Sequence, residues 1–384
     1  MRIVILIYSL GGGGAERVTS ILARAWADAG HTVTVLTMAA GDSFYEGHAG
    51  VTYRSLASAT EASGFLQGVT ANVQRIAAVR RNILDLRADI AIGMMTTASV
   101  LVALACCGTG CRSLGAERVH PPRHPIPVFW RVARKFTYGL LNAVIAQTHM
   151  TAQWINNNTF ARRLAIIPNP VLWPLQEAGI GKNPSEIVAP NRNVLLSVGR
   201  LSPQKNHAFL LRTFALVAAA NPSWDLVILG EGQDRASLEH QAIALGLTGR
   251  FLLPGGVTNL QAWFRQASLF AMTSNYEGFP NALLEAMAYG LPVLSVDCDT
   301  GPRDIIRDHV DGILVPADDE KSFATALSML MKDTKLRERL ACRAIEVRER
   351  FSLSRILLLW DSLFADIGAS QGIKRFKSQV GHDR

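Results

Sequence analysis

One stretch of this 384-residue chain decides both its fold and the place of its site: residues 275–292, which read Asn-Tyr-Glu-Gly-Phe-Pro-Asn-Ala-Leu-Leu-Glu-Ala-Met-Ala-Tyr-Gly-Leu-Pro. Asn281 is a favourable N-cap residue for the helix that follows it. Gly290 and Pro292 stop that helix, since glycine suits the position after a helix and proline cannot continue one. The stretch therefore predicts a short helix with a defined start, preceded by a loop that contains Gly and Pro.

The start of this helix has the properties of a phosphate site. The first-turn amides of Ala282, Leu283 and Leu284 are expected to lack intrahelical partners, and free amides at a helix N-terminus attract anions. Glu285 lies one turn inside the helix, where a carboxylate can accept hydrogen bonds from ribose hydroxyls. Glu277 lies before the helix, where it can reach a donor sugar. Compensation of the helix dipole accounts for one glutamate but not for both.

Strands and helices alternate on both sides of this stretch. Such alternation predicts a parallel sheet with helices on both faces. The predicted strands of this half lie near residues 194–198, 225–229, 269–273 and 292–296, and the predicted helices near 207–219, 234–245 and 282–289.

The first half of the chain repeats the pattern. Arg2–Tyr8 is an apolar strand that ends in a glycine cluster, an amphipathic helix follows, and His31–Met38 is the next strand. We therefore predict an α/β protein of two doubly wound, Rossmann-like domains that face a cleft. The predicted domains are residues 1–173 and 194–350, with a linker at 174–193 and a helix at 353–366 that packs back on the first domain.

A second segment with chemical meaning follows the first strand of the second half. It reads Val198-Gly-Arg-Leu-Ser-Pro-Gln-Lys-Asn206 and is expected to open a helix. Gly199 permits close approach of the backbone to a ligand. Arg200 and Lys205 would place two cations beside a diphosphate, whose charge grows when the bond to a sugar breaks.

The net charge of +8 is concentrated in the first half. Residues 1–180 contain 16 Lys and Arg against 9 Asp and Glu, a balance of +7, whereas residues 181–384 contain 23 against 22, a balance of +1. A basic face suits an anionic membrane or a phosphorylated substrate. No nucleic-acid-binding motif is present, and we expect no nucleic-acid partner. The candidate membrane patch consists of Arg75, Arg80, Arg81, Arg131, Arg134 and Lys135, with Phe129 and Trp130 as apolar neighbours.

The uncharged stretch from Ile90 to Cys111 is long enough to span a bilayer. Glycine, serine and threonine dilute its hydropathy. A buried strand at Ile90–Met94, a turn and a buried helix explain it better.

Taken in order, the motifs resemble the family-4 glycosyltransferases, especially those that build bacterial polysaccharides and lipid-linked oligosaccharides. The resemblance extends over nearly the whole chain and implies the GT-B fold. The motifs that carry it are Gly-Gly-Ala-Glu-Arg at 13–17, Gly-Arg-Leu-x4-Asn at 199–206, Gly-Glu-Gly at 230–232, Glu-x7-Glu at 277–285, Thr-Gly-Pro-Arg-Asp at 300–304 and Asp-Gly-Ile-Leu-Val-Pro at 311–316.

The resemblance implies roles for individual residues. Arg200, Lys205, Glu277, Arg118 and Glu117 are the expected catalytic residues, where Arg118 takes the place of a histidine found in many relatives and His120 is a candidate partner. The expected nucleotide-sugar contacts are Gly12, Gly13, Gly14, Gly199, Gly256, Val257, Asn281, Ala282, Leu283 and Glu285.

The implied reaction is transfer of a sugar, with retention, from a nucleotide-diphosphate sugar to a lipid-linked or polysaccharide-precursor acceptor. A UDP-hexose or UDP-N-acetylhexosamine is favoured over a GDP-sugar as donor. No metal and no cofactor beyond the donor substrate is expected. We expect the protein in the cytoplasm, held peripherally on the cytoplasmic face of the inner membrane.

Other functions remain open at this point. A sugar-nucleotide epimerase shares the fold, and a catalytically inactive sugar-binding protein would keep the cleft. A nicotinamide-dependent oxidoreductase fits poorly, because Glu16 stands where the dinucleotide fingerprint needs its third glycine. Asp297 and Asp299 have the Asp-x-Asp spacing of metal-dependent transferases, but those enzymes have another fold.

Overall fold

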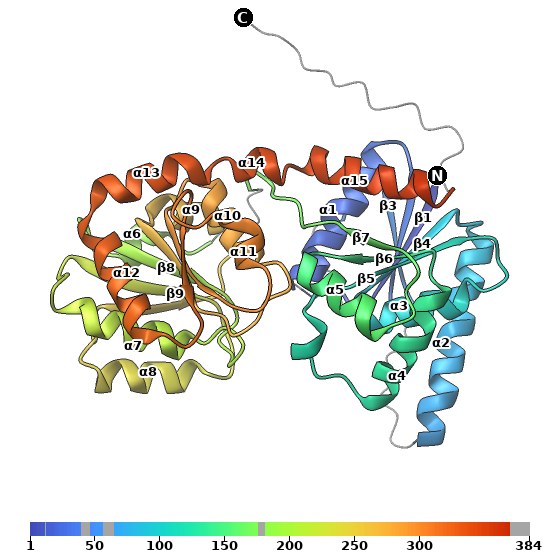
Figure 1. The fold of residues 1–384 in the computed structure, drawn as a ribbon, viewed down its shortest axis with the longest axis horizontal. Coiled ribbons are helices and arrows are strands. Elements are labelled where there is room, and N and C mark those ends of the chain that lie inside the picture. The colour runs from blue at the N-terminus through green and yellow to red at the C-terminus, as the bar shows by residue number, and fades with distance from the viewer. Residues whose placement is uncertain (12, 40–46, 57–64, 176–180, 369–384) are drawn as a thin grey trace, which may run out of the picture.

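The chain forms two α/β domains that lie side by side, each built around a parallel sheet (Figure 1). The structure, a computed structural model, describes residues 1–11, 13–39, 47–56, 65–175 and 181–368. The predicted architecture of two doubly wound domains is confirmed.

The N-terminal domain has a seven-stranded sheet in the order β3-β2-β1-β4-β5-β6-β7. All neighbouring strands are parallel, as strand–helix–strand connections require. Its strands are β1 Arg2–Ile7, β2 Thr32–Thr37, β3 Val51–Ser55, β4 Ile90–Met94, β5 Arg112–Ala116, β6 Ala143–Ala146 and β7 Leu164–Ile166. Its main helices are α1 Gly14–Asp28, α2 Phe65–Asp85, α3 Met95–Ala105, α4 Val128–Thr137 and α5 His149–Asn158.

The C-terminal domain has a six-stranded parallel sheet in the order β10-β9-β8-β11-β12-β13. Its strands are β8 Asn193–Val198, β9 Trp224–Leu229, β10 Phe251–Gly255, β11 Leu269–Met272, β12 Val293–Asp297 and β13 Ile313–Pro316. Its longer helices are α7 His207–Ala218, α8 Arg235–Ala244, α9 Leu260–Gln266, α10 Asn281–Ala288, α12 Glu320–Lys332 and α13 Thr334–Ala344, and the short ones are α6 Pro184–Ile187, α11 Pro302–Ile305 and α14 Val347–Arg350.

Each sheet has a point where the strand order reverses. This switch lies between β1 and β4 in the first domain and between β8 and β11 in the second. Loops on the two sides of a switch point diverge at the carboxyl ends of the strands and leave a crevice, where ligands of such folds bind. The two domains turn these ends toward each other, and the site lies there.

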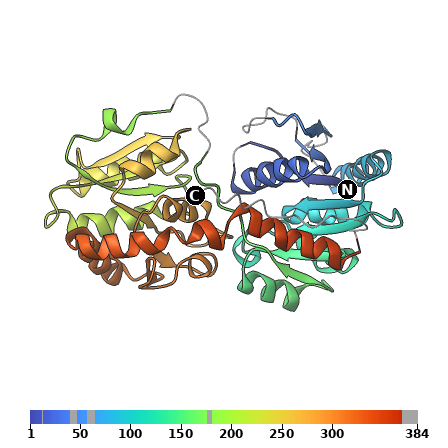
Figure 2. The ribbon, with the colours of Figure 1, turned by 90° about the horizontal axis from the view of Figure 1, so that it is seen from above.

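The last described helix, α15 (Leu353–Asp366), crosses back to the N-terminal domain and lies along it (Figures 1 and 2). Trp360 and Phe364 are fully buried there, and their rings lie 5.4 and 5.6 Å from the ring of Trp26 on α1. The apolar side of α15 thus completes the core of a domain that is more than 180 residues away in sequence.

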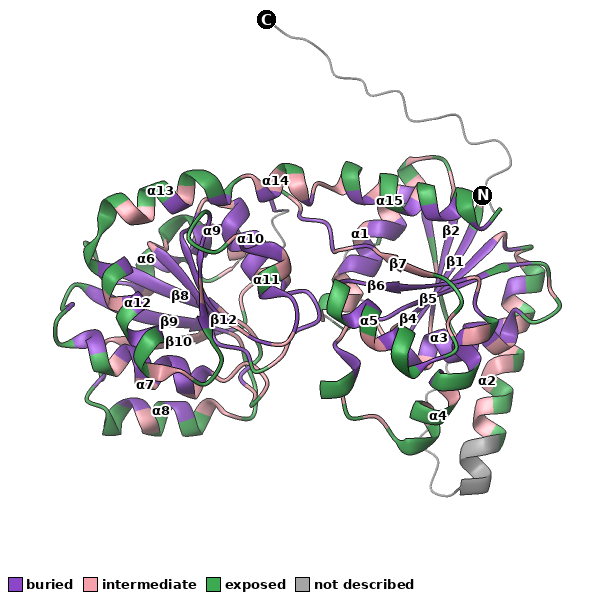
Figure 3. Ribbon diagram, viewed as in Figure 1, coloured by how far each residue is buried: buried purple, intermediate pink, exposed green. Residues whose placement is uncertain are grey.

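The uncharged stretch 90–111 forms β4 and α3, both largely buried inside the N-terminal domain (Figure 3). The expected turn between them is missing, because α3 begins directly after β4, with Met95 at φ +73°. Within the described parts of the chain, no helix has the length and apolarity needed to cross a membrane.

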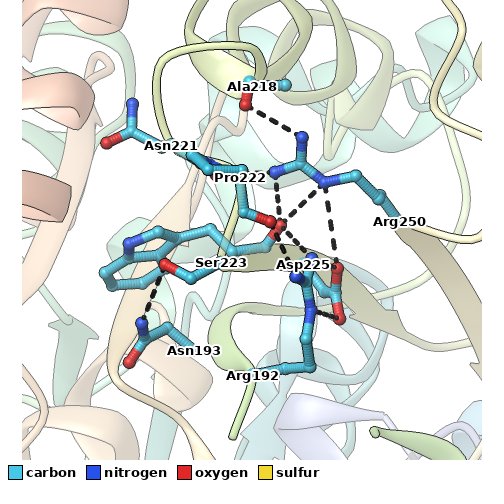
Figure 4. A network of polar contacts seen from close by, with 9 residues as sticks. Arg192, Asn193, Ala218, Asn221, Pro222, Ser223, Asp225 and Arg250 are labelled. Carbon is cyan, nitrogen blue, oxygen red and sulfur yellow. Dashed lines mark hydrogen bonds and ion pairs between the residues drawn. The ribbon is translucent and has the colours of Figure 1, made fainter.

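A polar network fixes the end of the second sheet that faces away from the cleft (Figure 4). Arg192 holds the carboxylate of Asp225 through two nitrogens, at 2.9 and 2.5 Å. Arg250 donates to the backbone oxygens of Ala218, Asn221 and Trp224. These contacts tie the turn between α7 and β9 to the starts of β8 and β9, which gives both arginines a structural role.

Candidate active site between the two domains

A cleft lies between the carboxyl ends of the two sheets. Residues of both domains line it. The N-terminal domain contributes Gly13, Gly14, Glu16, Arg17, Thr96, Thr97, Arg118, Gln147 and Asn169, and the C-terminal domain contributes Gly199, Arg200, Lys205, Val257, Thr258, Glu277, Asn281, Ala282 and Glu285.

Helix α10 points its N-terminus at this cleft. The helix begins one residue earlier than predicted. Asn281 is the first helical residue rather than the N-cap, which is Pro280. The Asn281 side chain instead accepts a hydrogen bond from Asn169 of the other domain, Nδ2 to Oδ1 at 2.7 Å. Leu284 donates to the Pro280 carbonyl at 3.2 Å, so the expectation that its amide is free is wrong. The amides that precede the first intrahelical bond belong to Asn281, Ala282 and Leu283.

Glu277 is held in the loop before α10 by two donors from its own domain. Lys205 Nζ lies 2.5 Å from Glu277 Oε1, and Ser274 Oγ donates to the same oxygen at 2.6 Å. The carboxylate is almost fully buried. A side chain on the neighbouring Gly278 would lie 2.2 Å from the Arg118 carbonyl oxygen, which explains the glycine. The two motifs therefore meet in space, and Lys205 and Glu277 form one unit.

Glu285 is buried in the first turns of α10 and pairs with a cation of the opposite domain. Arg17 Nη1 on α1 lies 2.7 Å from Glu285 Oε1. Burial raises the pKa of Glu285, and the Arg17 guanidinium offsets only part of that rise. Sequence reasoning missed this role of Arg17, although the residue stands in the Gly-Gly-Ala-Glu-Arg motif.

The loop between β8 and α7 brings the second cation to the cleft. Arg200 is exposed at the cleft wall. A side chain on Gly199 would come within 3.2 Å of the aliphatic carbons of Lys205, so this position needs a small residue for the lysine to lie across it. Asn206 adopts φ +50° and precedes α7. The loop thus holds Arg200 and Lys205 on the same side of the cleft as Glu277.

Glu117 corrects one expectation. Its side chain is fully buried inside the N-terminal domain and is absent from the cleft wall. It accepts hydrogen bonds from Thr96 Oγ1 at 2.9 Å and from Tyr138, and Arg134 lies 3.8 Å away. Glu117 and Arg118 follow an extended strand, in which successive side chains point to opposite faces. Arg118 therefore reaches the cleft, and Glu117 stabilises the interior.

The other predicted site residues differ in whether they line the cleft. His120 is buried, its Nδ1 lies 3.4 Å from Thr151 Oγ1, and it does not line the cleft. Gly12 lies outside the described residues. Gly13, Gly14, Gly199, Val257, Asn281 and Ala282 line the cleft, whereas Gly256 and Leu283 do not, and the Leu283 side chain belongs to the domain core.

The Asp-x-Asp pair is used in ion pairs. Arg303 Nε lies 2.9 Å from Asp297 Oδ1, and Arg123 of the other domain lies 2.7 Å from Asp299 Oδ2. Arg123–Asp299 and Arg17–Glu285 are both ion pairs between the domains, in addition to the Asn169–Asn281 hydrogen bond.

Comparison with known proteins places the two domains in one family. Residues 12–171 match the model "Glycosyltransferase Family 4", and residues 182–347 match "Glycosyl transferases group 1". A relative from Campylobacter jejuni, "GalNAc-alpha-(1->4)-GalNAc-alpha-(1->3)-diNAcBac-PP-undecaprenol alpha-1,4-N-acetyl-D-galactosaminyltransferase", is 27% identical over 96% of this chain and 99% of its own length. The "Amylovoran biosynthesis glycosyltransferase AmsD" of Erwinia amylovora is 24% identical over 94% of this chain and 99% of its own length.

Solved structures show the same fold. Anabaena Alr3699/HepE in complex with UDP and glucose has a TM-score of 0.77 at 20% identity and covers 95% of this chain and 99% of its own. Sucrose-phosphate synthase from Thermosynechococcus elongatus has a TM-score of 0.82 at 17% identity and covers 96% of this chain and 100% of its own.

Proposed function

The chain is a glycosyltransferase of family 4 with the GT-B fold, and on this premise we propose that it moves a sugar from a nucleotide-diphosphate sugar to a lipid-linked or polysaccharide-precursor acceptor, with retention of configuration. One observation carries the proposal: the N-terminus of α10, both glutamates and both cations converge on the same cleft. Glycosyl transfer explains all of these groups, so the alternative functions of an epimerase or an inactive sugar-binding protein are not needed.

The proposed donor lies with its diphosphate at the first-turn amides of α10, between Arg200 and Lys205. The bond that breaks joins the sugar C1 to a phosphate oxygen, and its electron pair stays on that oxygen. Fixed cations and amides stabilise this charge as it develops. The bond that forms joins C1 to the acceptor oxygen, whose proton passes to the departing phosphate oxygen. Glu285 accepts hydrogen bonds from the ribose hydroxyls, and Glu277 accepts one from the sugar.

The relatives support the details of this proposal. The Campylobacter jejuni relative is named for an α-linkage and for an undecaprenol diphosphate acceptor, and the Anabaena structure was solved with UDP. An α-linked product from an α-configured nucleotide sugar is a retaining outcome. We therefore favour a UDP-hexose or UDP-N-acetylhexosamine donor over a GDP-sugar.

A metal is not part of the proposal. Arg200, Lys205 and the α10 amides supply the positive charge that a divalent cation would otherwise bring. Asp297 and Asp299 are paired with arginines.

The protein should slowly release free nucleoside diphosphate from a UDP-hexose or UDP-N-acetylhexosamine, and do so in the presence of EDTA. We expect the rate with chelator to stay within about twofold of the rate without it, because the charged groups of the site belong to the chain. The measurement is a coupled assay against a panel of UDP- and GDP-sugars, with NMR of the released sugar or product to establish its anomeric configuration.

Three results would contradict the proposal. An epimerised nucleotide sugar without transfer or hydrolysis indicates an epimerase, and binding without turnover indicates a sugar-binding protein. Activity that disappears with EDTA and returns with manganese or magnesium would indicate that Asp297 and Asp299 bind a metal ion required for transfer.

We also propose peripheral attachment to an anionic membrane, through a surface that overlaps the predicted patch only in part. Two of the predicted contact residues are engaged elsewhere. Arg134 is buried against Glu117 and lies 4.6 Å from the Trp154 ring. Arg80 donates to the carbonyl oxygens of Ala105 and Cys107 at the end of α3.

Helix α4 offers the better membrane contact, because its apolar side faces outward. Phe129, Val132 and Phe136 have 53%, 51% and 58% of their surface exposed, at helical spacing. Arg131 and Lys135 are exposed on the same helix. An outward apolar face flanked by basic residues is the pattern of helices that lie in a membrane interface. We call this the α4 face.

Changing Phe129 and Phe136 to Ser and Arg131 and Lys135 to Gln should abolish sedimentation with vesicles that contain anionic lipid. The wild type should bind such vesicles at low salt, bind neutral vesicles weakly and detach at high salt, because each surface Lys or Arg contributes about 1 kcal/mol that salt screens.

The matched control replaces exposed apolar residues of the C-terminal domain, Leu216→Ser with Ile243→Ser, and should sediment like the wild type. Equal loss in the control would remove the α4 face from the proposal. Formation of a dimer that the α4 variant breaks, without vesicle binding, would identify a second copy of the chain as the occupant.

A further inference from the structure

The Arg118 guanidinium is buried in the wall of the cleft without a carboxylate partner among the described residues. Nη1 donates to Asn169 Oδ1 at 3.1 Å, and Nη2 lies 3.8 Å from the Met94 sulfur. Nε has no hydrogen-bond partner within the part of the chain that the structure describes. Burial alone lowers the pKa of Arg118 to about 10, so the group still carries its charge at neutral pH.

Two other cations of the site have a carboxylate partner. Arg17 faces Glu285 and Lys205 faces Glu277, each through a short contact. Arg134, which is as buried as Arg118, has Glu117 nearby. A buried charge without a counter-ion is unfavourable unless something pairs with it. The position of Arg118 on the cleft wall indicates that its counter-charge arrives with a ligand.

A neutral hydrogen-bond acceptor, the side chain of Gln147, lies beside this cation. The Gln147 side chain donates through Nε2 to Asn169 Oδ1 at 2.6 Å, and this is the same oxygen that accepts from Arg118. Gln147 Oε1 is buried and accepts no hydrogen bond from any residue that the structure describes. Thr97 in the first turn of α3 lines the same wall, where backbone amides add positive charge. A ligand that satisfies this wall presents an anionic group and a hydroxyl close together.

We propose that Arg118 and Gln147 bind an anionic sugar, with the guanidinium on its charged group and the Gln147 oxygen accepting a hydrogen bond from a neighbouring hydroxyl. This inference rests on the proposed glycosyl transfer and extends it to the substrate class. The charged group has two possible sources, the carboxylate of a uronic acid on the donor or the phosphate of a sugar diphosphate on the acceptor.

Calorimetry with two pairs of probes distinguishes the sources. The donor pair is UDP-glucuronic acid against UDP-glucose. The acceptor pair, measured with UDP present, is N-acetylglucosaminyl diphosphate on a short citronellyl chain against free N-acetylglucosamine. One charged member should bind the wild type about tenfold or more tightly than its neutral counterpart, as expected for a hydrogen-bonded charge pair in a buried site. Arg118→Gln should remove this preference, and Arg118→Lys should keep part of it.

A further test variant is Asn169→Asp, which places a carboxylate where Arg118 Nη1 already donates. It should weaken the charged probe about tenfold or more, because the new carboxylate supplies the missing counter-charge from within the chain. UDP alone should bind all three variants within about threefold of the wild type, since the groups proposed to hold its diphosphate and ribose lie in the other domain.

The outcomes are separable. A preference for the charged donor or for the charged acceptor, lost in Arg118→Gln, identifies the source. No preference in either pair while UDP binds overturns the inference and leaves the proposed function intact. If UDP itself fails to bind, the proposed function fails, and the inference is then judged by the two probe pairs alone: a preference for a charged member that Arg118→Gln removes supports it, and no preference in either pair overturns it.

Discussion

Lys205→Ala and Arg200→Ala should each lower kcat by about 10²-fold or more, measured with the donor that the substrate panel identifies. The expected loss is that of removing a group that stabilises charge in the transition state. Both cations belong to the loop that follows β8, opposite the start of α10, and Lys205 Nζ is fixed 2.5 Å from Glu277. The donor substrate carries less of the developing charge than the transition state does, so KM should change less than kcat.

The controls for these variants remove charge elsewhere in the same domain. Arg212 pairs with Glu320 on the surface, and Lys321 is exposed. Arg212→Ala and Lys321→Ala should keep kcat within about twofold of the wild type. A Tm measurement separates a folding defect from a catalytic one in Lys205→Ala, because that change leaves the buried Glu277 without its cation. Turnover within about threefold of the wild type in either cleft variant would refute the assigned role.

Glu285→Gln and Glu277→Gln should damage different steps. Ribose is present in donor and product alike, so Glu285→Gln should weaken bare UDP about tenfold or more, as expected for lost hydrogen bonds to a charged group. Glu277→Gln should leave UDP affinity within about threefold and lower kcat about 10²-fold, because the sugar is absent from UDP. Calorimetry with the bare nucleotide and a turnover assay give the two readouts. Equal loss of nucleotide affinity in both variants would sink the assignment.

The same site predicts a pH dependence of nucleotide binding. The ribose hydroxyls need an ionised Glu285 as acceptor, so affinity is present above its pKa and lost as the pH falls through it. Because burial raises this pKa, the loss should begin at a higher pH than for an ordinary glutamate. Arg17→Gln removes the group that partly offsets the rise and should move the loss to a still higher pH, whereas Glu285→Gln should bind with no such dependence.

The sequence by itself determined the fold and the local form of the site. Apolar strands that alternate with helices specify parallel sheets whose strand ends form a cleft. Gly290 and Pro292 fixed the end of α10, and the spacing of 277 and 285 put one glutamate before the helix and the other inside it. These features depend on residues a few positions apart, and the backbone conformation of a short segment is enough to produce them.

Only the tertiary structure decided which groups meet. Asn281 lies at the first helical position rather than capping the helix, because its side chain accepts a hydrogen bond across the cleft from Asn169, 112 residues earlier. Glu117 and Arg118 are neighbours in the chain, yet one is turned inward to Tyr138 and the other faces the cleft. The pairing of Arg17 with Glu285 depends on how segments from two domains come together, and so does the lack of a carboxylate beside Arg118 among the described residues. Such contacts leave no local pattern, since their energy comes from burial and charge pairing between segments that only folding brings together.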